Sequence, residues 1–280
     1  MPTELDRLRA KLSAFARHPM HDPVPSPGGE RKTGLGPADL DRFLEGGLGR
    51  GALHEIFAAG PLDAGAAAGF AAALTRRVLD DASAEKNGTD KTVVWVRQAF
   101  VNVEAGSLYG PGLAGLGLDP ADLVLVEAKD PLGVLKAGLE AARCSALGAV
   151  VIEPWGAPKV LDFTASRRLA LAASEAGTTV LLLRLQAEPQ QSAAETRWRV
   201  AAGPSRPLAA NAPGAAAFTI ELLRHRTGPA GRRWHLEWDH GQCLFTQPAR
   251  RAPLPRPVVS LPQRGSHPAP LPAERTRTGT

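Results

Sequence analysis

The chain has 280 residues, of which 44 % are hydrophobic and 5 % aromatic, enough for one domain of roughly 200–250 residues with flanking tails. Its two distant cysteines, Cys144 and Cys243, and seven scattered histidines exclude a disulfide framework and show no zinc-ligand spacing. No apolar run approaches 20 residues and the chain starts with a polar, charged segment, so we expect a cytoplasmic protein with no membrane span, metal or cofactor.

Basic residues concentrate at the end of the chain. The sequence carries a net charge of +5, with an isoelectric point near 9.6. Residues 247–280 hold six arginines and one glutamate, so the rest of the chain is neutral overall. Such a tail attracts nucleic acid or an acidic partner non-specifically, or is only a solvated end. Its eight prolines predict disorder.

Residues 4–17 predict a short amphipathic helix, followed by a Pro- and Gly-rich linker over 18–32. A lone helix on a linker cannot bury its own apolar stripe. We therefore expect it to dock on the body of the protein or on another molecule. The stripe consists of Leu5, Leu8, Leu12 and Phe15.

Residues 55–74 read as an apolar strand, a turn bounded by glycines and an Ala-rich helix, which is the outline of a phosphate-binding loop. Gly60 and Gly65 have the spacing that the loop requires. Ala66 stands where the loop needs a lysine for the phosphates, and Ala67 where it needs a hydroxyl for Mg²⁺. We interpret the segment as a phosphate loop without nucleotide chemistry; the alternative is an ordinary strand–turn–helix with two chance glycines.

Apolar strands alternate with helices through the middle of the chain, after a short helix that we expect from about Pro37. This pattern predicts an α/β fold with a mainly parallel sheet covered on both faces. We expect antiparallel strands after residue 196, two of them joined as a hairpin through 226–233. We expect a first core strand at the end of 33–57. Further expected strands cover 92–96, 123–127, 149–153, 178–185, 197–201, 218–225 and 234–238, and the expected helices cover 66–79, 130–147 and 161–176.

Five segments follow one another along the chain: TGLGPADLDRFLEGGLGRGALHEIF, WVRQ, LYGPGLAGLGLDPADL, ETRWRVAAGPS and ELLRHRTGPAGRRWHLEWD. In this order they resemble the RecA/RadA recombinase core over most of 33–246, and within it the ImuA family of RecA-like proteins from bacterial damage-inducible (SOS) mutagenesis cassettes. The resemblance implies a RecA-like core of the phosphate-loop NTPase type at 33–246, between an N-terminal helix and linker (1–32) and the tail (247–280).

The resemblance also implies which amino acids for binding and hydrolysing a nucleotide are missing. Glu153 occupies the position of the Walker B acid, although a plain strand-end acid before Pro154 is the simpler interpretation. Residues 97–99 offer no acid where RecA has its water-activating glutamate. Two regions, 154–159 and 186–196, match the two DNA-binding loops of RecA. Both are short, which argues against RecA-like DNA binding in a filament.

Six arginines near the end of the core interleave with Trp198, Trp234 and Trp238. Arginines and aromatic rings together can hold single-stranded nucleic acid. We favour the alternative, a solvated hairpin face whose tryptophans pack into the core, because the core has no net charge. The six arginines are Arg197, Arg199, Arg224, Arg226, Arg232 and Arg233.

The resemblance implies a non-catalytic accessory protein for error-prone translesion synthesis, with no catalytic residue. Its implied partners are an ImuB-type Y-family protein and an error-prone polymerase related to the replicative polymerase III α subunit, with RecA and weak DNA binding as further candidates. Because the N-terminal helix of RecA-like proteins docks on a neighbouring subunit, the resemblance favours a partner for residues 4–17.

Two other functions stay open from the sequence. The first is an ATP-binding RecA/RadA-like recombination protein that uses Glu153 and a lysine from elsewhere, such as Lys91, Lys129 or Lys159. The second is a SulA-like inhibitor of cell division.

Overall fold

The computed structural model describes residues 31–85, 92–212 and 214–248. In this part of the chain a nine-stranded sheet has the order β11-β10-β9-β8-β3-β7-β6-β4-β5, and a separate two-stranded sheet joins β1 to β2. The predicted N-terminal helix, its linker up to residue 30, Lys91 and the tail beyond residue 248 lie outside the described residues.

The strands and helices alternate along the chain, as the sequence predicts. The strands are β1 (Lys32–Thr33), β2 (Leu48–Gly49), β3 (Leu53–Ala58), β4 (Val93–Gln98), β5 (Leu123–Ala128), β6 (Ala149–Glu153), β7 (Thr179–Arg184), β8 (Thr196–Ala202), β9 (Ala217–His225), β10 (Arg232–Asp239) and β11 (Leu244–Thr246). The helices are α2 (Ala38–Phe43), α3 (Ala64–Glu85), α4 (Ala99–Ala105), α5 (Gly110–Gly115), α6 (Pro131–Ala142) and α7 (Phe163–Ala176), with 3₁₀ turns η1 (Pro61–Asp63), η2 (Pro120–Asp122) and η3 (Ala209–Asn211).

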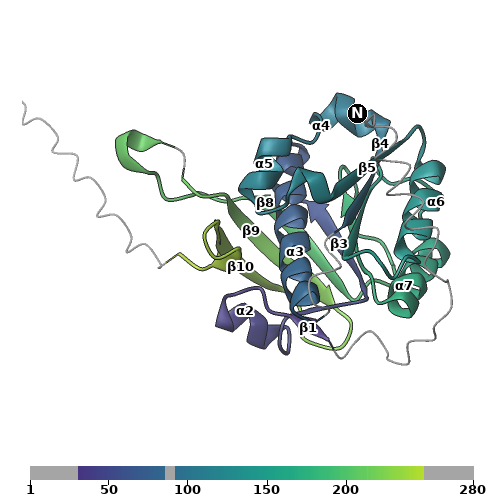
Figure 1. The fold of residues 1–280 in the computed structure, drawn as a ribbon, viewed down its shortest axis with the longest axis horizontal. Coiled ribbons are helices and arrows are strands. Elements are labelled where there is room, and N and C mark those ends of the chain that lie inside the picture. Colours follow the sequence, from purple (N-terminus) through teal and green to yellow (C-terminus); the bar gives the residue numbers. More distant parts are fainter. Residues whose placement is uncertain (1–30, 86–91, 213, 249–280) are drawn as a thin grey trace, which may run out of the picture. The chain divides into compact units, whose positions relative to one another are not determined.

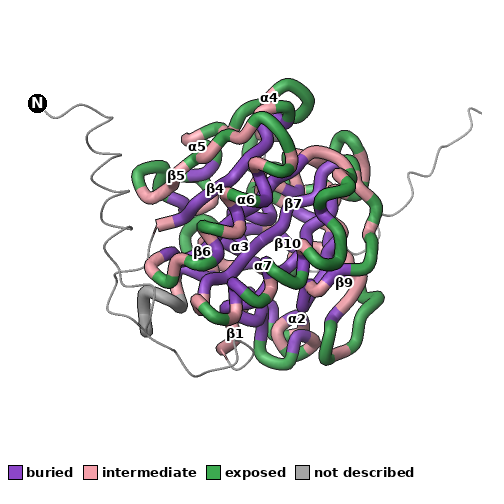
Figure 2. The backbone as a smooth tube through the Cα atoms, turned by 90° about the vertical axis from the view of Figure 1, so that its right-hand side faces the viewer, coloured by how far each residue is buried: buried purple, intermediate pink, exposed green. Residues whose placement is uncertain are grey.

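Strands β3 to β8 all run parallel, and helices cover both faces of this part of the sheet. Helix α3 packs on one face, as Figure 1 shows, while α6 and α7 pack on the other. The inner strands are buried along their whole length (Figure 2), which explains why they read as continuous apolar runs. The predicted α/β class with a mainly parallel sheet is confirmed.

The last strands extend the sheet in antiparallel fashion. Buried and half-buried residues alternate along β9 and β10, so one face joins the core on the α3 side and the other faces out. Trp198, Trp234 and Trp238 lie on the buried face, where they contact Phe70 or Phe245 or each other. The packing interpretation of these tryptophans is confirmed.

Element ends differ from the sequence expectations in several places. Helix α4 begins directly after β4, and its N-cap residue, Gln98, makes no side-chain capping bond, so the sequence carries no start signal. Helix α5 lies in a stretch that reads as irregular because of its glycines and Pro111. Helix α6 ends at Ala142, five residues before the expected end, whereas Gly177 caps α7 in the left-handed conformation as predicted.

Within the described ranges, the helices are too short or too polar to cross a bilayer.

Candidate functional site

The turn after β3 lies where a phosphate loop would stand. Gly60 begins the 3₁₀ turn η1, which runs directly into α3, and the Asp63 amide donates to the Gly60 carbonyl at 3.0 Å. The Asp63 carboxylate accepts from the Ala202 amide at 2.9 Å, which ties the turn to the end of β8. An acid is therefore fixed where phosphate would bind, and its charge repels an anion.

Ala66 and Ala67 lie in the first turn of α3 and pack toward the core. Ala67 is fully buried in the cluster between α3 and the sheet, and Ala66 packs against the same cluster. Gly65 is exposed, with open space around it. The predicted strand–turn–helix is present, but neither alanine offers a cation or a hydroxyl.

Glu153 lies at the carboxyl end of β6, directly beside Arg97 at the corresponding position of β4. The Arg97 Nε atom lies 2.8 Å from Glu153 Oε2, and the Trp95 indole donates to the same oxygen at 2.8 Å. Both charged side chains are buried. Burial raises the pKa of Glu153, and the Arg97 charge opposes this rise.

The pair continues into a short polar network. Arg97 donates to Asn102 Oδ1 at 2.7 Å, and the Asn102 amide donates in turn to Glu127. Sequence reasoning noted that residues 97–99 lack an acid but missed Arg97 as the partner of Glu153. The sequence shows an arginine and a glutamate near the ends of two buried strands, but not that these strands are neighbours.

No group of three or more His, Cys, Asp or Glu side chains in the described ranges is arranged to hold a metal ion. Arg97 neutralises the Glu153 carboxylate, so the carboxyl end of the parallel sheet holds an internal ion pair.

A second buried ion cluster lies on the opposite face of the sheet, around Glu55 of β3. Arg197 Nε lies 2.9 Å from Glu55 Oε2, and Ser192 Oγ donates to the same oxygen at 2.6 Å. Arg184 approaches Glu55 Oε1 at 3.6 Å and lies over the Phe57 ring. This cluster fastens the segment before β8 to the sheet.

The structure does not bring the six candidate arginines together. Arg197 is buried in the Glu55 cluster, and Arg224 donates to the Ser192 carbonyl at its edge. Arg199 and Arg233 both approach Glu221 on the open face of the antiparallel strands, at 3.8 and 3.0 Å.

The other two arginines lie apart from these. Arg232 pairs with Asp39 of α2 and lies over the Phe43 and Trp234 rings, while Arg226 is exposed in the hairpin turn. Their nucleic-acid role stays a prediction, and their separation gives it little support.

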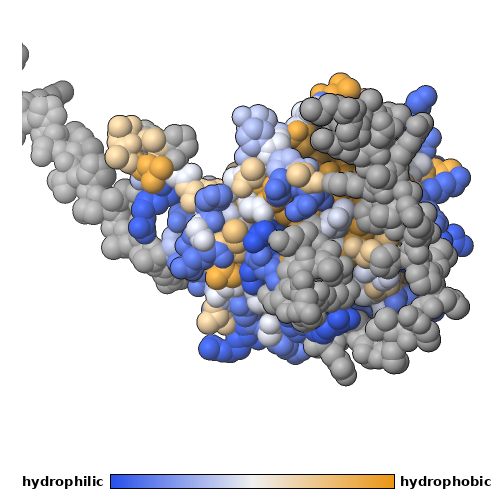
Figure 3. Space-filling view, viewed as in Figure 1, coloured by the Kyte–Doolittle hydropathy of each residue, from blue (hydrophilic) through white to orange (hydrophobic). Residues whose placement is uncertain are grey.

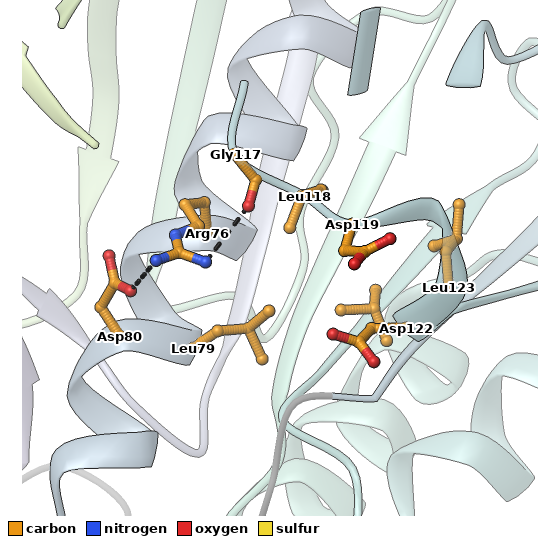
Figure 4. A pocket seen from close by; sticks show the side chains of 9 residues that line it. Arg76, Leu79, Asp80, Gly117, Leu118, Asp119, Asp122 and Leu123 are labelled. Atoms are coloured by element: carbon orange, nitrogen blue, oxygen red, sulfur yellow. Dashed lines mark hydrogen bonds and ion pairs between the residues drawn. The ribbon is translucent and has the colours of Figure 1, made fainter. Parts of the chain in front are cut away.

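A cavity of about 310 Å³ opens beside the second half of α3 (Figure 4). Asp119 and Asp122 border it, and Asp80 pairs there with Arg76, whose guanidinium also donates to the Gly117 carbonyl at 3.2 Å. It lies where β4 and β5 begin, away from Gly60 and Glu153. Its acidic border would repel phosphate, so it is no substitute for a nucleotide site.

Comparison with known proteins identifies the family. No protein-family model matches the chain. Protein ImuA of Caulobacter vibrioides, found in two strains, is 33 % identical over 231 residues, which cover 78 % of this chain and 84 % of the relative. The chain belongs to the ImuA family. Among solved structures, the crystal structure of the RadB recombinase matches with 14 % identity and a TM-score of 0.46 over 72 % of this chain and 94 % of that chain.

The ImuA-family assignment confirms the resemblance drawn from the sequence. The core of this ImuA-family chain has a mainly parallel sheet, with the α3 helix after β3 and the antiparallel strands appended to it. Its candidate site has two parts: the Arg97–Glu153 pair, and the turn after β3 with Asp63 bound to Ala202 and with Ala66 and Ala67 in the first turn of α3.

Proposed function

We propose that this ImuA-family chain is a non-catalytic RecA-like accessory protein for error-prone translesion synthesis after DNA damage. It acts through contacts with other proteins in the cytoplasm. Its partners are an ImuB-type Y-family protein and an error-prone DNA polymerase, with RecA as a further candidate. Family membership supports the setting in a damage-inducible mutagenesis cassette.

The main support for the proposal that the protein is non-catalytic is the Arg97–Glu153 ion pair. Phosphoryl transfer from ATP requires a lysine on the phosphates, a hydroxyl and an acid on Mg²⁺, and a residue that positions water. Here alanines stand at the first two positions, and Arg97 neutralises the acid at 2.8 Å. Each missing element removes a different part of the mechanism, so restoring one cannot recover hydrolysis.

Hydrolysis by the purified full-length protein tests this part. We expect no ATP hydrolysis above background, with or without single-stranded DNA. Glu153→Gln is the matched control, because it removes the carboxylate but keeps the side-chain length. Hydrolysis that the control abolishes would contradict the proposal, whereas hydrolysis that persists unchanged identifies a contaminant.

Co-purification tests the accessory role separately. Tagged full-length protein is recovered from cells of the source bacterium after ultraviolet damage, and bound proteins are identified by mass spectrometry. We expect a Y-family polymerase-like protein, with or without a polymerase III α-like chain. If neither protein is recovered, the proposed accessory role is contradicted. The test of ATP hydrolysis is independent of this result.

A further inference from the structure

Large hydrophobic side chains are exposed where the parallel strands β5, β4 and β6 end. Phe100 and Val103 lie on α4, directly after β4, and Val103 is 76 % exposed. Trp155 follows β6, and its ring centroid lies 5.9 Å from that of Phe100. Figure 3 shows hydrophobic surface at the top of the molecule, where Figure 1 places α4. We call this surface the apolar edge; it comprises Phe100, Val103, Leu132, Trp155, Val160 and Phe163.

Ligands of open α/β sheets bind at the carboxyl ends of the strands. In this chain that end carries an internal ion pair and exposed apolar side chains, which is the composition of a protein-docking surface. Apart from the internal Arg97–Glu153 pair, the charged residues at and soon after the ends of these strands have an acidic excess. They are Glu104, Glu127, Asp130 and Asp162, against Lys129 and Lys159. An occupant that fits is therefore an apolar stripe flanked by basic side chains.

We propose that residues 4–17 of the same chain bind the apolar edge. This segment predicts a helix with one apolar stripe, and its charged residues give a net charge of +2. The stripe complements the exposed side chains, and the basic residues complement the acidic excess around them. The sequence predicts that this helix binds either the body of the same chain or another molecule. The apolar edge is a binding surface for it on the same chain.

The linker is long enough for this contact. Arg31, where the described chain begins, lies close to Gly177: its guanidinium is 3.5 Å from the position of a Cβ on that glycine. Gly177 caps the end of α7, a helix of 14 residues whose first residue, Phe163, belongs to the apolar edge. At about 1.5 Å per residue this helix spans roughly 21 Å. Residues 18–30 reach about 43 Å when extended, at roughly 3.3 Å per residue.

Hydrogen exchange of the full-length protein, read by mass spectrometry on peptides that cover residues 4–17, tests the proposal. We expect slow exchange in the wild type and at least about tenfold faster exchange after the double substitution Val103→Asp and Val160→Asp, because each lost apolar contact weakens docking. Leu171→Asp is the matched control: Leu171 is 58 % exposed on α7 but lies outside the apolar edge, so exchange stays as in the wild type.

A second variant tests the same contact by changing the N-terminal helix and measuring hydrogen exchange at the apolar edge. Leu8→Asp with Leu12→Asp should speed exchange across residues 99–105 and leave exchange in β3 unchanged. Sedimentation velocity on the same samples should show a monomer. The proposal is overturned if residues 4–17 of the wild type exchange like a free peptide, or if their protection survives the two edge substitutions. Protection that appears only with dimer formation also overturns it, since the helix then binds a second copy.

Discussion

Arg97 and Glu153 lie at the carboxyl ends of two neighbouring parallel strands, where open α/β sheets bind their ligands, and their charged groups meet at 2.8 Å in the interior. The Arg97 guanidinium supplies the counter-charge for this buried acid. Removal of one partner leaves the other charge buried, which is more costly than removal of both.

We expect Arg97→Ala to lower the free energy of unfolding by about 3–5 kcal/mol, because Glu153 then stays buried without a counter-charge. Arg97→Met combined with Glu153→Gln should lower it less, since no charge remains and the glutamine oxygen still accepts from Trp95. Urea denaturation followed by tryptophan fluorescence measures both. An equal loss in the two variants would show that the pair is not coupled.

Restoring the consensus residues of the phosphate loop should not restore nucleotide binding. Ala66→Lys and Ala67→Thr supply the lysine and the hydroxyl, but Asp63 stays fixed to Ala202 and Glu153 stays paired with Arg97. Because Ala67 is fully buried, the larger threonine should also lower stability by about 1–3 kcal/mol. Calorimetric titration with Mg²⁺-ATP checks the first expectation; saturable binding would show that the alanines alone disable the site.

The parallel core could be predicted from sequence because its strands are buried on both faces and therefore read as unbroken apolar runs. The contacts of the site could not. Arg97 meets Glu153 only because β4 lies beside β6, and Asp63 meets Ala202 only because β8 lies beside β3. This strand order is a property of the whole sheet, so no local pattern contains it.

The same reason explains why Arg197 read as a candidate for nucleic acid. Its neighbours in sequence are polar and aromatic, which suits a binding surface, whereas its partner Glu55 is 142 positions away in the chain. The alternation along β9 and β10 did place the tryptophans correctly, since a period of two separates the buried face from the open one.

Glu55 should be essential for stability. Glu55→Gln leaves the Arg184 and Arg197 charges in the interior without an anion, so we expect a loss of about 3–5 kcal/mol in the free energy of unfolding. Glu188→Gln is a suitable control, because its side chain is 91 % exposed and its ion pair with Arg199 should contribute almost nothing. Thermal unfolding followed by circular dichroism compares the two; similar melting temperatures would contradict the expected role of Glu55.

Acid should destabilise the protein through two buried histidines. Burial lowers the pKa of His54 below 6.5, and burial likewise lowers that of His225. His54 is fully buried, with one ring nitrogen 2.7 Å from Thr196 Oγ1 and the other 2.8 Å from the Gly49 carbonyl.

A histidine whose pKa is lowered by folding binds its proton more readily in the unfolded chain. Well above pH 6.5 both states of the chain hold it neutral, so stability does not depend on it. As the pH falls below 6.5, the unfolded state gains protons first and the free energy of unfolding decreases. Urea denaturation at pH 7.5, 6.5 and 5.5 should show this decrease. It should be smaller in His54→Gln, whose amide cannot titrate; an identical pH dependence in that variant would exclude His54 as the cause.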